Sequence, residues 1–264
     1  RGERVQEQQN RQRASRLLCR GVEASWIFSR GGQSWQMNIN NLKIYNADCM
    51  AIMKNYPDDY FDLAVVDPPY GIGTETGQRN AVSRRGSRAA AKWKNPTGQN
   101  YRAFDDSKPP KEGYFIELQR VSKNQIIWGG NYFTEFMKPS KGWIVWNKKA
   151  DIKEHLSMCE LAWSSFNKKC NMFEFLWAGF KKAIQEKRIH PTQKPIALYK
   201  WIYANYAEAG QKILDTHLGS GSNAIAAHYA DMGEFVGCEL DEEYYTAACK
   251  RIENETAQLT LGFE

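Results

Sequence analysis

The chain has 264 residues, 42% of them hydrophobic and 25% charged, and a mass of 30.4 kDa, which suits one globular domain rather than two. Lysine and arginine outnumber aspartate and glutamate by 36 to 30, and the net charge of +6 mildly favours a polyanionic partner. Because the chain lacks both an apolar run near the roughly 18 residues that span a bilayer and a signal-peptide core, we expect a soluble, cytoplasmic protein without a membrane partner.

Residues 1–36 are predicted to form a disordered or non-native arm. They contain no methionine and are rich in Arg, Gln, Ser and Gly without sustained periodicity. Met37 is the first methionine and stands just before the first strand-like segment, residues 42–45. A hypothesis is therefore that translation starts at Met37, which leaves 37–264 as a single catalytic domain.

Beyond the arm, short β-branched or aromatic runs alternate with helix-length stretches. The predicted strands are 42–45, 61–66, 125–128, 143–146, 161–166, 173–177, 212–214 and 234–238, and helices are predicted at 196–206 and 223–232. This alternation indicates an α/β fold in which a mostly parallel, twisted sheet carries helices on both faces.

The tetrapeptide Asp67-Pro68-Pro69-Tyr70 follows the apolar run 61–66 and is the first candidate site. A carboxylate at the carboxyl end of a central strand lies where open α/β sheets bind ligands. The two prolines hold the neighbouring carbonyls rigidly, so Asp67 and a carbonyl could accept both hydrogens of an aromatic amine and favour its attack on a methyl group. Tyr70 could stack on a base taken out of a duplex. An ordinary strand-to-turn connection is the structural alternative.

Residues 71–111 break the alternation and are predicted to form a long, mobile, basic loop. The segment has nine basic and three acidic residues and therefore carries a net charge of +6. Such a loop could close on a DNA backbone, although a solvated flexible loop is the simpler interpretation. The predicted DNA-binding residues of this loop are Arg79, Arg84, Arg85, Arg88, Lys92 and Lys94.

Two later segments are candidates for binding a cofactor. Thr192 and Lys194 stand at the start of helix 196–206, where free backbone amides can hold an anion or carboxylate, or they simply form a helix-entry loop. Further on, strand 212–214 is followed by a glycine turn and a helix. The predicted contacts in and after this turn are Asp215, Gly219, Ser220, Gly221, Ser222 and Glu239.

Glu239 ends strand 234–238, where an acid can bind ribose hydroxyls, whereas Asp241 is expected to cap the next helix. NAD is a weaker alternative, because the third glycine position of its G-x-G-x-x-G pattern is Ala224. His217 is expected to be structural rather than a catalytic base, since no nearby nucleophile needs activation.

The six cysteines form no C-x-x-C pair, so we expect reduced, mostly buried thiols, with neither disulfides nor a metal.

Together these segments resemble the amino-group DNA methyltransferases. Asp67 to Tyr70 resembles their motif IV, 190–195 their motif X, and Asp215-x-x-x-Gly219-x-Gly221 their motif I. Thr216 and His217 depart from the family pattern, which usually has Pro and Phe there. The segment 46–49 resembles the stretch whose aspartate, here Asp48, lies beside the adenine end of S-adenosylmethionine, and Asp67 is expected to contact both the target base and this cofactor.

The order of the motifs resembles the circularly permuted β class, with a Rossmann-like fold and a target-recognition insertion at about 149–189. The resemblance implies site-specific methylation of duplex DNA by a monomer or homodimer, by base flipping and with or without a companion restriction enzyme. N6 of adenine is favoured because the tetrapeptide begins with Asp, whereas relatives acting on N4 of cytosine more often begin with Ser. N4-cytosine methylation, an RNA target and an inactive nucleic-acid-binding relative remain alternatives.

Overall fold

The computed structural model describes residues 24–29, 34–72, 108–149, 157–178, 181–182, 184 and 186–257. The strands are β1 (Ala24–Ser29), β2 (Ser34–Ile39), β3 (Leu42–Asn46), β4 (Leu63–Val66), β5 (Gln125–Trp128), β6 (Ile144–Asn147), β7 (Cys159–Ser164), β8 (Asn171–Glu174), β9 (Trp177–Ala178), β10 (Lys181–Lys182), β11 (Lys212–Asp215) and β12 (Glu234–Glu239). The helices are α2 (Cys49–Met53), α3 (Glu112–Val121), α4 (Ile196–Tyr206), α5 (Ser222–Tyr229) and α6 (Glu242–Thr256), with 3-10 turns η1 (Gly130–Tyr132) and η2 (Thr134–Phe136).

Ten strands form one twisted sheet in the order β1-β2-β3-β12-β11-β4-β5-β7-β6-β8, and β9 pairs with β10 apart from it. The five central strands, from β3 to β5, are parallel to one another. β4 and β5 are buried along their whole length, as expected where a parallel sheet is covered on both faces. The predicted α/β fold is therefore confirmed, but the sheet is mixed, because β1 with β2, β2 with β3, β5 with β7 and β6 with β7 pair antiparallel.

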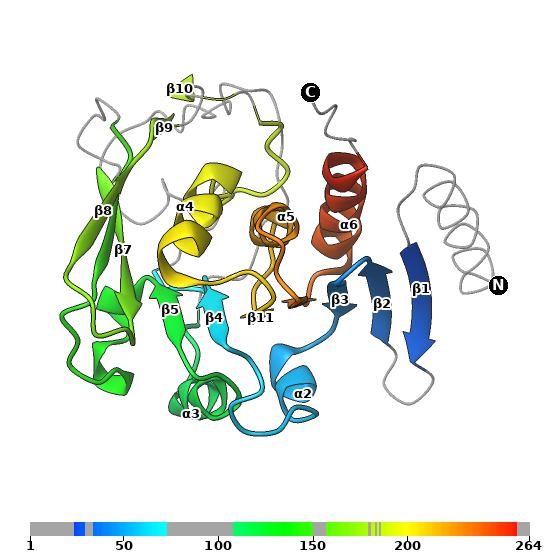
Figure 1. Ribbon diagram of the computed structural model, residues 1–264, viewed down its shortest axis with the longest axis horizontal. Coiled ribbons are helices and arrows are strands. Elements are labelled where there is room, and N and C mark those ends of the chain that lie inside the picture. The colour runs from blue at the N-terminus through cyan, green and yellow to red at the C-terminus, as the bar shows by residue number, and fades with distance from the viewer. Residues whose placement is uncertain are drawn as a thin grey trace, which may run out of the picture.

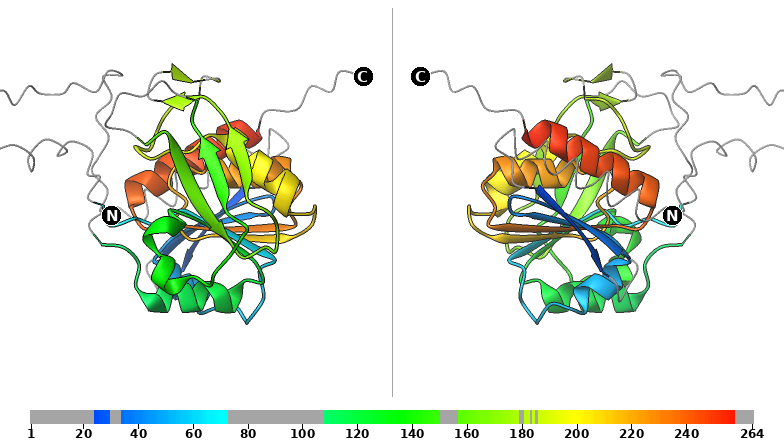
Figure 2. Two further views of the ribbon diagram at one scale, coloured as in Figure 1. Left: turned by 90° about the vertical axis from the view of Figure 1, so that its left-hand side faces the viewer. Right: turned by 90° about the vertical axis from the view of Figure 1, so that its right-hand side faces the viewer.

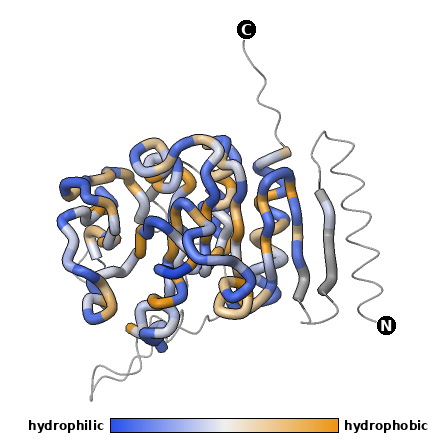
Figure 3. Tube along the Cα trace, turned by 60° about the horizontal axis from the view of Figure 1, so that its bottom comes forward, coloured by the Kyte–Doolittle hydropathy of each residue, from blue (hydrophilic) through white to orange (hydrophobic). Residues whose placement is uncertain are grey.

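Helices cover both faces of this sheet. In Figure 1, α4, α5 and α6 lie on one side and α2 and α3 on the other, and the views of Figure 2 show the sheet between them. One hydrophobic core joins the sheet to α4, α5 and α6, and a second joins it to α2 and α3. Figure 3 shows hydrophobic and hydrophilic stretches alternating along the described part of the chain.

The predicted disordered arm is corrected where β1 and β2 form. These strands pair with each other, and β2 pairs with β3, so residues 24–29 and 34–36 belong to the edge of the sheet. Met37 lies in the middle of β2, fully buried opposite Ile44. A chain beginning at Met37 would retain only the second half of this strand. The rest of the predicted arm, 1–23 and 30–33, lies outside the described residues.

The predicted target-recognition region, about 149–189, includes two strands of the large sheet, β7 and β8. β7 lies inside the sheet between β5 and β6 and pairs with both, because Ala162 and Trp163 are buried core residues. The predicted strand 173–177 is instead divided between the end of β8 and the start of β9.

The structure also bears on the expected burial of the cysteines and on membrane-spanning helices. Cys238 and Cys249 are buried, but Cys159 and Cys170 are exposed, so the expectation of mostly buried thiols is wrong for the described cysteines. No helix in the described part of the chain combines the length and apolarity that a bilayer crossing needs.

Candidate active site

The parallel strands bring the predicted acids to one edge of the sheet. Asp48 follows β3, Asp67 follows β4, Asp215 ends β11 and Glu239 ends β12. These four strands lie side by side in the order β3-β12-β11-β4. The edge is therefore the carboxyl end of the parallel sheet, where open α/β folds bind ligands.

Asp67 is held on both of its oxygens. The Tyr70 hydroxyl donates to Oδ1 at 2.7 Å, and the Lys194 ammonium donates to Oδ2 at 2.5 Å. Lys194 stands just before α4, so the structure brings together the tetrapeptide and the 190–195 segment, 127 residues apart in the chain. Burial favours the neutral form of Lys194, but the carboxylates of Asp67 and Glu160 outweigh it and raise the pKa of the lysine.

Tyr70 lies in an aromatic group that the sequence pattern did not reveal. Its ring stacks on Tyr132 of η1, with centroids 5.1 Å apart and planes 18° apart. Gly129 has a positive φ of 68°, and a Cβ there would stand 2.2 Å from the Tyr70 ring. Glycine at this position therefore allows both the turn and the close approach of Tyr70. Burial, followed by the neighbouring Asp67 charge, raises the pKa of Tyr70 well above its usual value.

The glycine turn begins at Asp215, which accepts hydrogen bonds from the His217 amide at 3.1 Å and the Asn223 side chain at 2.9 Å. Asn223 also donates to the Val65 carbonyl at 3.0 Å and so ties α5 to the strand that carries Asp67. Gly219 and Gly221 both have positive φ, 54° and 77°. Burial raises the pKa of Asp215 to about 7.

Glu239 bridges the turn and the end of β12. Its two oxygens accept from the Gly219 amide at 2.8 Å and the Asp241 amide at 3.0 Å, and burial raises its pKa to about 7. The Asp241 side chain caps α6 by accepting from the Glu243 and Tyr244 amides, which confirms its predicted role.

Arg251 of α6 hydrogen-bonds to the glycine turn. Its guanidinium donates to the Ser220 carbonyl and the Ser222 hydroxyl, each at 2.9 Å, and pairs with Glu186 at 2.8 Å. Ser220 and Ser222 are buried. Sequence reasoning missed both Arg251 and Asn223, because each acts through a helix face and not through a recognisable motif.

The 190–195 segment lies against this turn. His190 stands beside Gly219, within 3.7 Å of the position that a Cβ there would take. The Thr192 hydroxyl lies 3.0 Å from His190 Nδ1. Burial lowers the pKa of His190 to about 4, so the ring is neutral at pH 7. Thr192 thus contacts the histidine, while Lys194 binds carboxylates of the protein itself.

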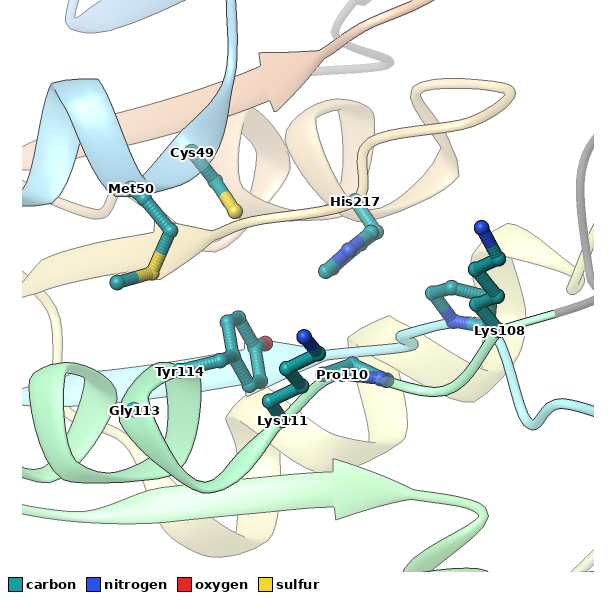
Figure 4. A pocket seen from close by; sticks show the side chains of 9 residues that line it. Cys49, Met50, Lys108, Pro110, Lys111, Gly113, Tyr114 and His217 are labelled. Carbon is teal, nitrogen blue, oxygen red and sulfur yellow. The ribbon is translucent and has the colours of Figure 1, made fainter.

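A cavity of about 390 Å³ opens beside the tetrapeptide. Its lining residues are Cys49, Met50, Pro69, Lys108, Pro110, Lys111, Gly113, Tyr114 and His217. Figure 4 shows Tyr114 of α3 and His217 pointing into the cavity from opposite sides. Thr216 Oγ1 lies between them, 2.6 Å from the Tyr114 hydroxyl and 2.9 Å from His217 Nδ1. Of the two residues that depart from the family pattern, His217 therefore lines the cavity, and the buried Thr216 contacts two of the lining side chains.

Other predicted residues lie elsewhere. Asp48 caps α2 by accepting from the Met50 amide at 2.7 Å, one residue from the cavity lining. The predicted DNA-binding residues, Arg79, Arg84, Arg85, Arg88, Lys92 and Lys94, lie outside the described part of the chain.

Comparison with known proteins identifies the family to which the chain belongs. Two relatives are the Type II methyltransferases M.ScaI of Streptomyces caespitosus, 23% identical over 83% of this chain and 84% of its own, and M.BglII of Bacillus subtilis, 24% identical over 81% and 69%. Among solved structures, the cytosine-N4-specific PvuII DNA methyltransferase shares the fold with a TM-score of 0.53 and 10% identity, over 83% of this chain and 93% of that one. A family model described as DNA methylase, of the N6 and N4 type, matches residues 61–250. Since that match spans well over half of the chain, the protein belongs to the N6/N4 DNA methylase family.

Proposed function

We propose that this chain transfers a methyl group from S-adenosylmethionine to the N6 amino group of an adenine that has been flipped out of duplex DNA. The observation that carries the proposal is the position of Asp67. Its carboxylate ends a central parallel strand, is fixed by Tyr70 and Lys194, and stands beside two prolines.

The residues around the edge of the sheet suit the proposed cofactor. The cavity of about 390 Å³ is lined by Pro69 and by the rings of Tyr114 and His217, surfaces that suit a planar base. The turn at Gly219 and Gly221 allows close approach of a ligand to the backbone, and Glu239 supplies a carboxylate for hydroxyl groups. When bound, the cofactor supplies an electrophilic methyl group on a sulfonium sulfur.

The chain's own residues would position the amine. Asp67 and the rigid carbonyl beside it would accept the two amino hydrogens, which localises the nitrogen lone pair and stabilises the positive charge that develops on the nitrogen. The stacked pair of Tyr70 and Tyr132 provides an aromatic surface at the same place, with Tyr132 46% exposed. Such a surface suits the face of an extruded base.

Adenine is favoured over cytosine because the tetrapeptide begins with aspartate. The cytosine-N4 specificity of the PvuII enzyme makes N4-cytosine the second candidate. The order of segments supports the permuted β class, since the tetrapeptide strand β4 precedes the glycine-turn strand β11 in the chain and lies next to it in the sheet. We place DNA contacts on the basic loop 71–111 and on the segment between β7 and α4.

The test is transfer of labelled methyl groups from S-adenosylmethionine to unmethylated bacteriophage DNA, with the same DNA denatured and with total RNA in parallel. The proposal predicts label in duplex DNA, with salt-dependent affinity because binding releases counterions from the phosphates. Label in RNA alone would contradict the proposed substrate. Cofactor binding without transfer to any nucleic acid would identify an inactive relative.

A further inference from the structure

A chain of four charged side chains begins at the proposed catalytic carboxylate; Lys194 is buried and the other three are partly buried. Lys194 lies between two carboxylates, 2.5 Å from Asp67 and 3.1 Å from Glu160 of β7. Glu160 in turn pairs with Lys148, just after β6, at 2.6 Å. The side chain of Lys194 is only 5% exposed and that of Glu160 24% exposed. Two positive and two negative groups therefore balance in a space with little access to water.

Glu160 is ionised in this arrangement. Burial alone would raise its pKa, but the ammonium groups of Lys194 and Lys148 outweigh burial and lower the pKa to about 2. Its position is set by the sheet, because β7 pairs with β5 on one side and with β6 on the other. Glu160 thus places a second negative charge within 3.1 Å of the Lys194 ammonium.

The pair formed by Lys194 and Asp67 creates a difficulty for the proposed reaction. An oxygen of Asp67 that accepts a hydrogen bond from Lys194 is less available to the amino group of a target base. A buried ammonium that loses its only carboxylate is left unpaired, which is strongly unfavourable. Lys194 could release Asp67 readily only if a second carboxylate remained in contact with it.

We infer that Glu160 is a positioning residue that retains Lys194 while Asp67 engages the target amine. This inference rests on the proposed function. Glu160 touches neither the base nor the cofactor in this account; it acts by sharing the lysine. The contact at 3.1 Å is already present, so a small movement of the ammonium group toward Glu160 frees Asp67 without leaving a buried charge unpaired.

The test compares Glu160→Gln with a matched control, Glu234→Gln. Glu234 of β12 is also partly buried and also has two partners, Lys43 at 2.7 Å and the Tyr60 hydroxyl at 2.7 Å, but it lies at the opposite, amino end of its strand. Each variant is assayed for methyl transfer to unmethylated bacteriophage DNA, for S-adenosylmethionine affinity by calorimetry, and for thermal stability.

For Glu160→Gln we expect kcat to fall about tenfold to hundredfold, as for a misplaced reacting group, while cofactor affinity changes less than about twofold and Glu160→Asp recovers part of the rate. Glu234→Gln should lower the melting temperature and leave kcat per folded molecule unchanged. A kcat for Glu160→Gln equal to that of the wild type, or an equal loss in the control, overturns the inference. If Glu160→Gln does not fold, Glu160→Ser takes its place, and a wild-type kcat in that variant overturns the inference. Absence of transfer by the wild type contradicts the proposed function itself.

Discussion

Asp67 is the central residue of the site. Among the described acids at this edge of the sheet, it hydrogen-bonds both to Tyr70 of the aromatic group and to Lys194 in the segment before α4. Its partners, Tyr70 and Lys194, both donate to it. The sequence predicted the tetrapeptide and the lysine as separate features. The structure adds that the lysine binds the tetrapeptide directly, a contact that no local pattern in the chain could reveal.

Replacing Asp67 with asparagine should separate catalysis from cofactor binding. The amide keeps the shape of the side chain but loses the negative charge that stabilises the methylated amine. We expect kcat to fall by about 100-fold or more, as when a transition-state partner is removed, and the dissociation constant of S-adenosylmethionine to change little. Calorimetry measures the latter. An equal loss of cofactor affinity would show that Asp67 serves the cofactor and not the target base.

The buried acids Asp215 and Glu239 give the protein a distinctive dependence on pH. Burial raises the pKa of each to about 7 in the folded chain, whereas unfolded carboxyl groups titrate near pH 4. Between about pH 4 and 7 the unfolded chain therefore releases protons that the folded chain keeps. Each group lowers the free energy of unfolding as pH rises through that window, and its effect is constant above it.

Glu239→Gln removes one of these contributions. The melting temperature of the variant minus that of the wild type should rise as pH increases from about 4 to 7 and then level off. Glu234→Gln is the opposite control, because Lys43 and Tyr60 outweigh burial and lower the pKa of Glu234. Its difference from the wild type should shrink as pH falls below about 4.5. Parallel curves for Glu239→Gln and the wild type would contradict the assigned burial.

At the scale of elements, the predicted strands 125–128 and 212–214 and the helix 196–206 match β5, β11 and α4 closely. The short apolar runs of the two strands are typical of buried parallel strands. The aromatic turn after β5 could not be predicted in the same way. Tyr70 and Gly129 are 59 positions apart in the sequence, and their contact depends on β4 and β5 being neighbours.

Gly129→Ala should disrupt this turn. The new Cβ would lie 2.2 Å from the Tyr70 ring, and the alanine would have to adopt a positive φ of 68°. We expect a loss of at least about 1 kcal/mol in unfolding free energy together with a fall in kcat as Tyr70 moves. Gly210→Ala is the control, because its φ of 83° imposes similar strain while its Cβ meets nothing within 4 Å. Equal kcat in the two variants would show that the Tyr70 position is unimportant for transfer.

At the scale of the whole molecule, the sequence predicted the parallel centre of the sheet but not its edges. β1 and β2 lie in a segment whose Arg- and Gln-rich composition resembles a disordered arm, and their pairing depends on the exposed edge of β3. β7 lies in the region 149–189, which the order of the motifs predicts to be the target-recognition region, and no local pattern there shows that its strands join the large sheet. Long-range pairing decides both cases, and it cannot be obtained from local periodicity.

The fold also explains why one edge carries the site. Acids from four strands meet there only because β3, β12, β11 and β4 are adjacent and parallel. Glu160 joins this group from β7, which lies on the other side of β5, begins at the same edge and runs antiparallel to β5. The site is thus assembled by the topology from segments that lie between residues 48 and 239 of the chain.

The most direct test of the proposed N6-adenine methyltransferase activity is nucleoside analysis of duplex DNA that has been incubated with the purified wild-type protein and S-adenosylmethionine. Enzymatic digestion followed by mass spectrometry distinguishes N6-methyladenine from N4-methylcytosine, and Asp67→Asn provides the background. We expect N6-methyladenine in DNA treated with the wild-type protein and not in DNA treated with Asp67→Asn. N4-methylcytosine alone would contradict the choice of adenine, and the absence of both products would contradict the assignment as an active DNA methyltransferase.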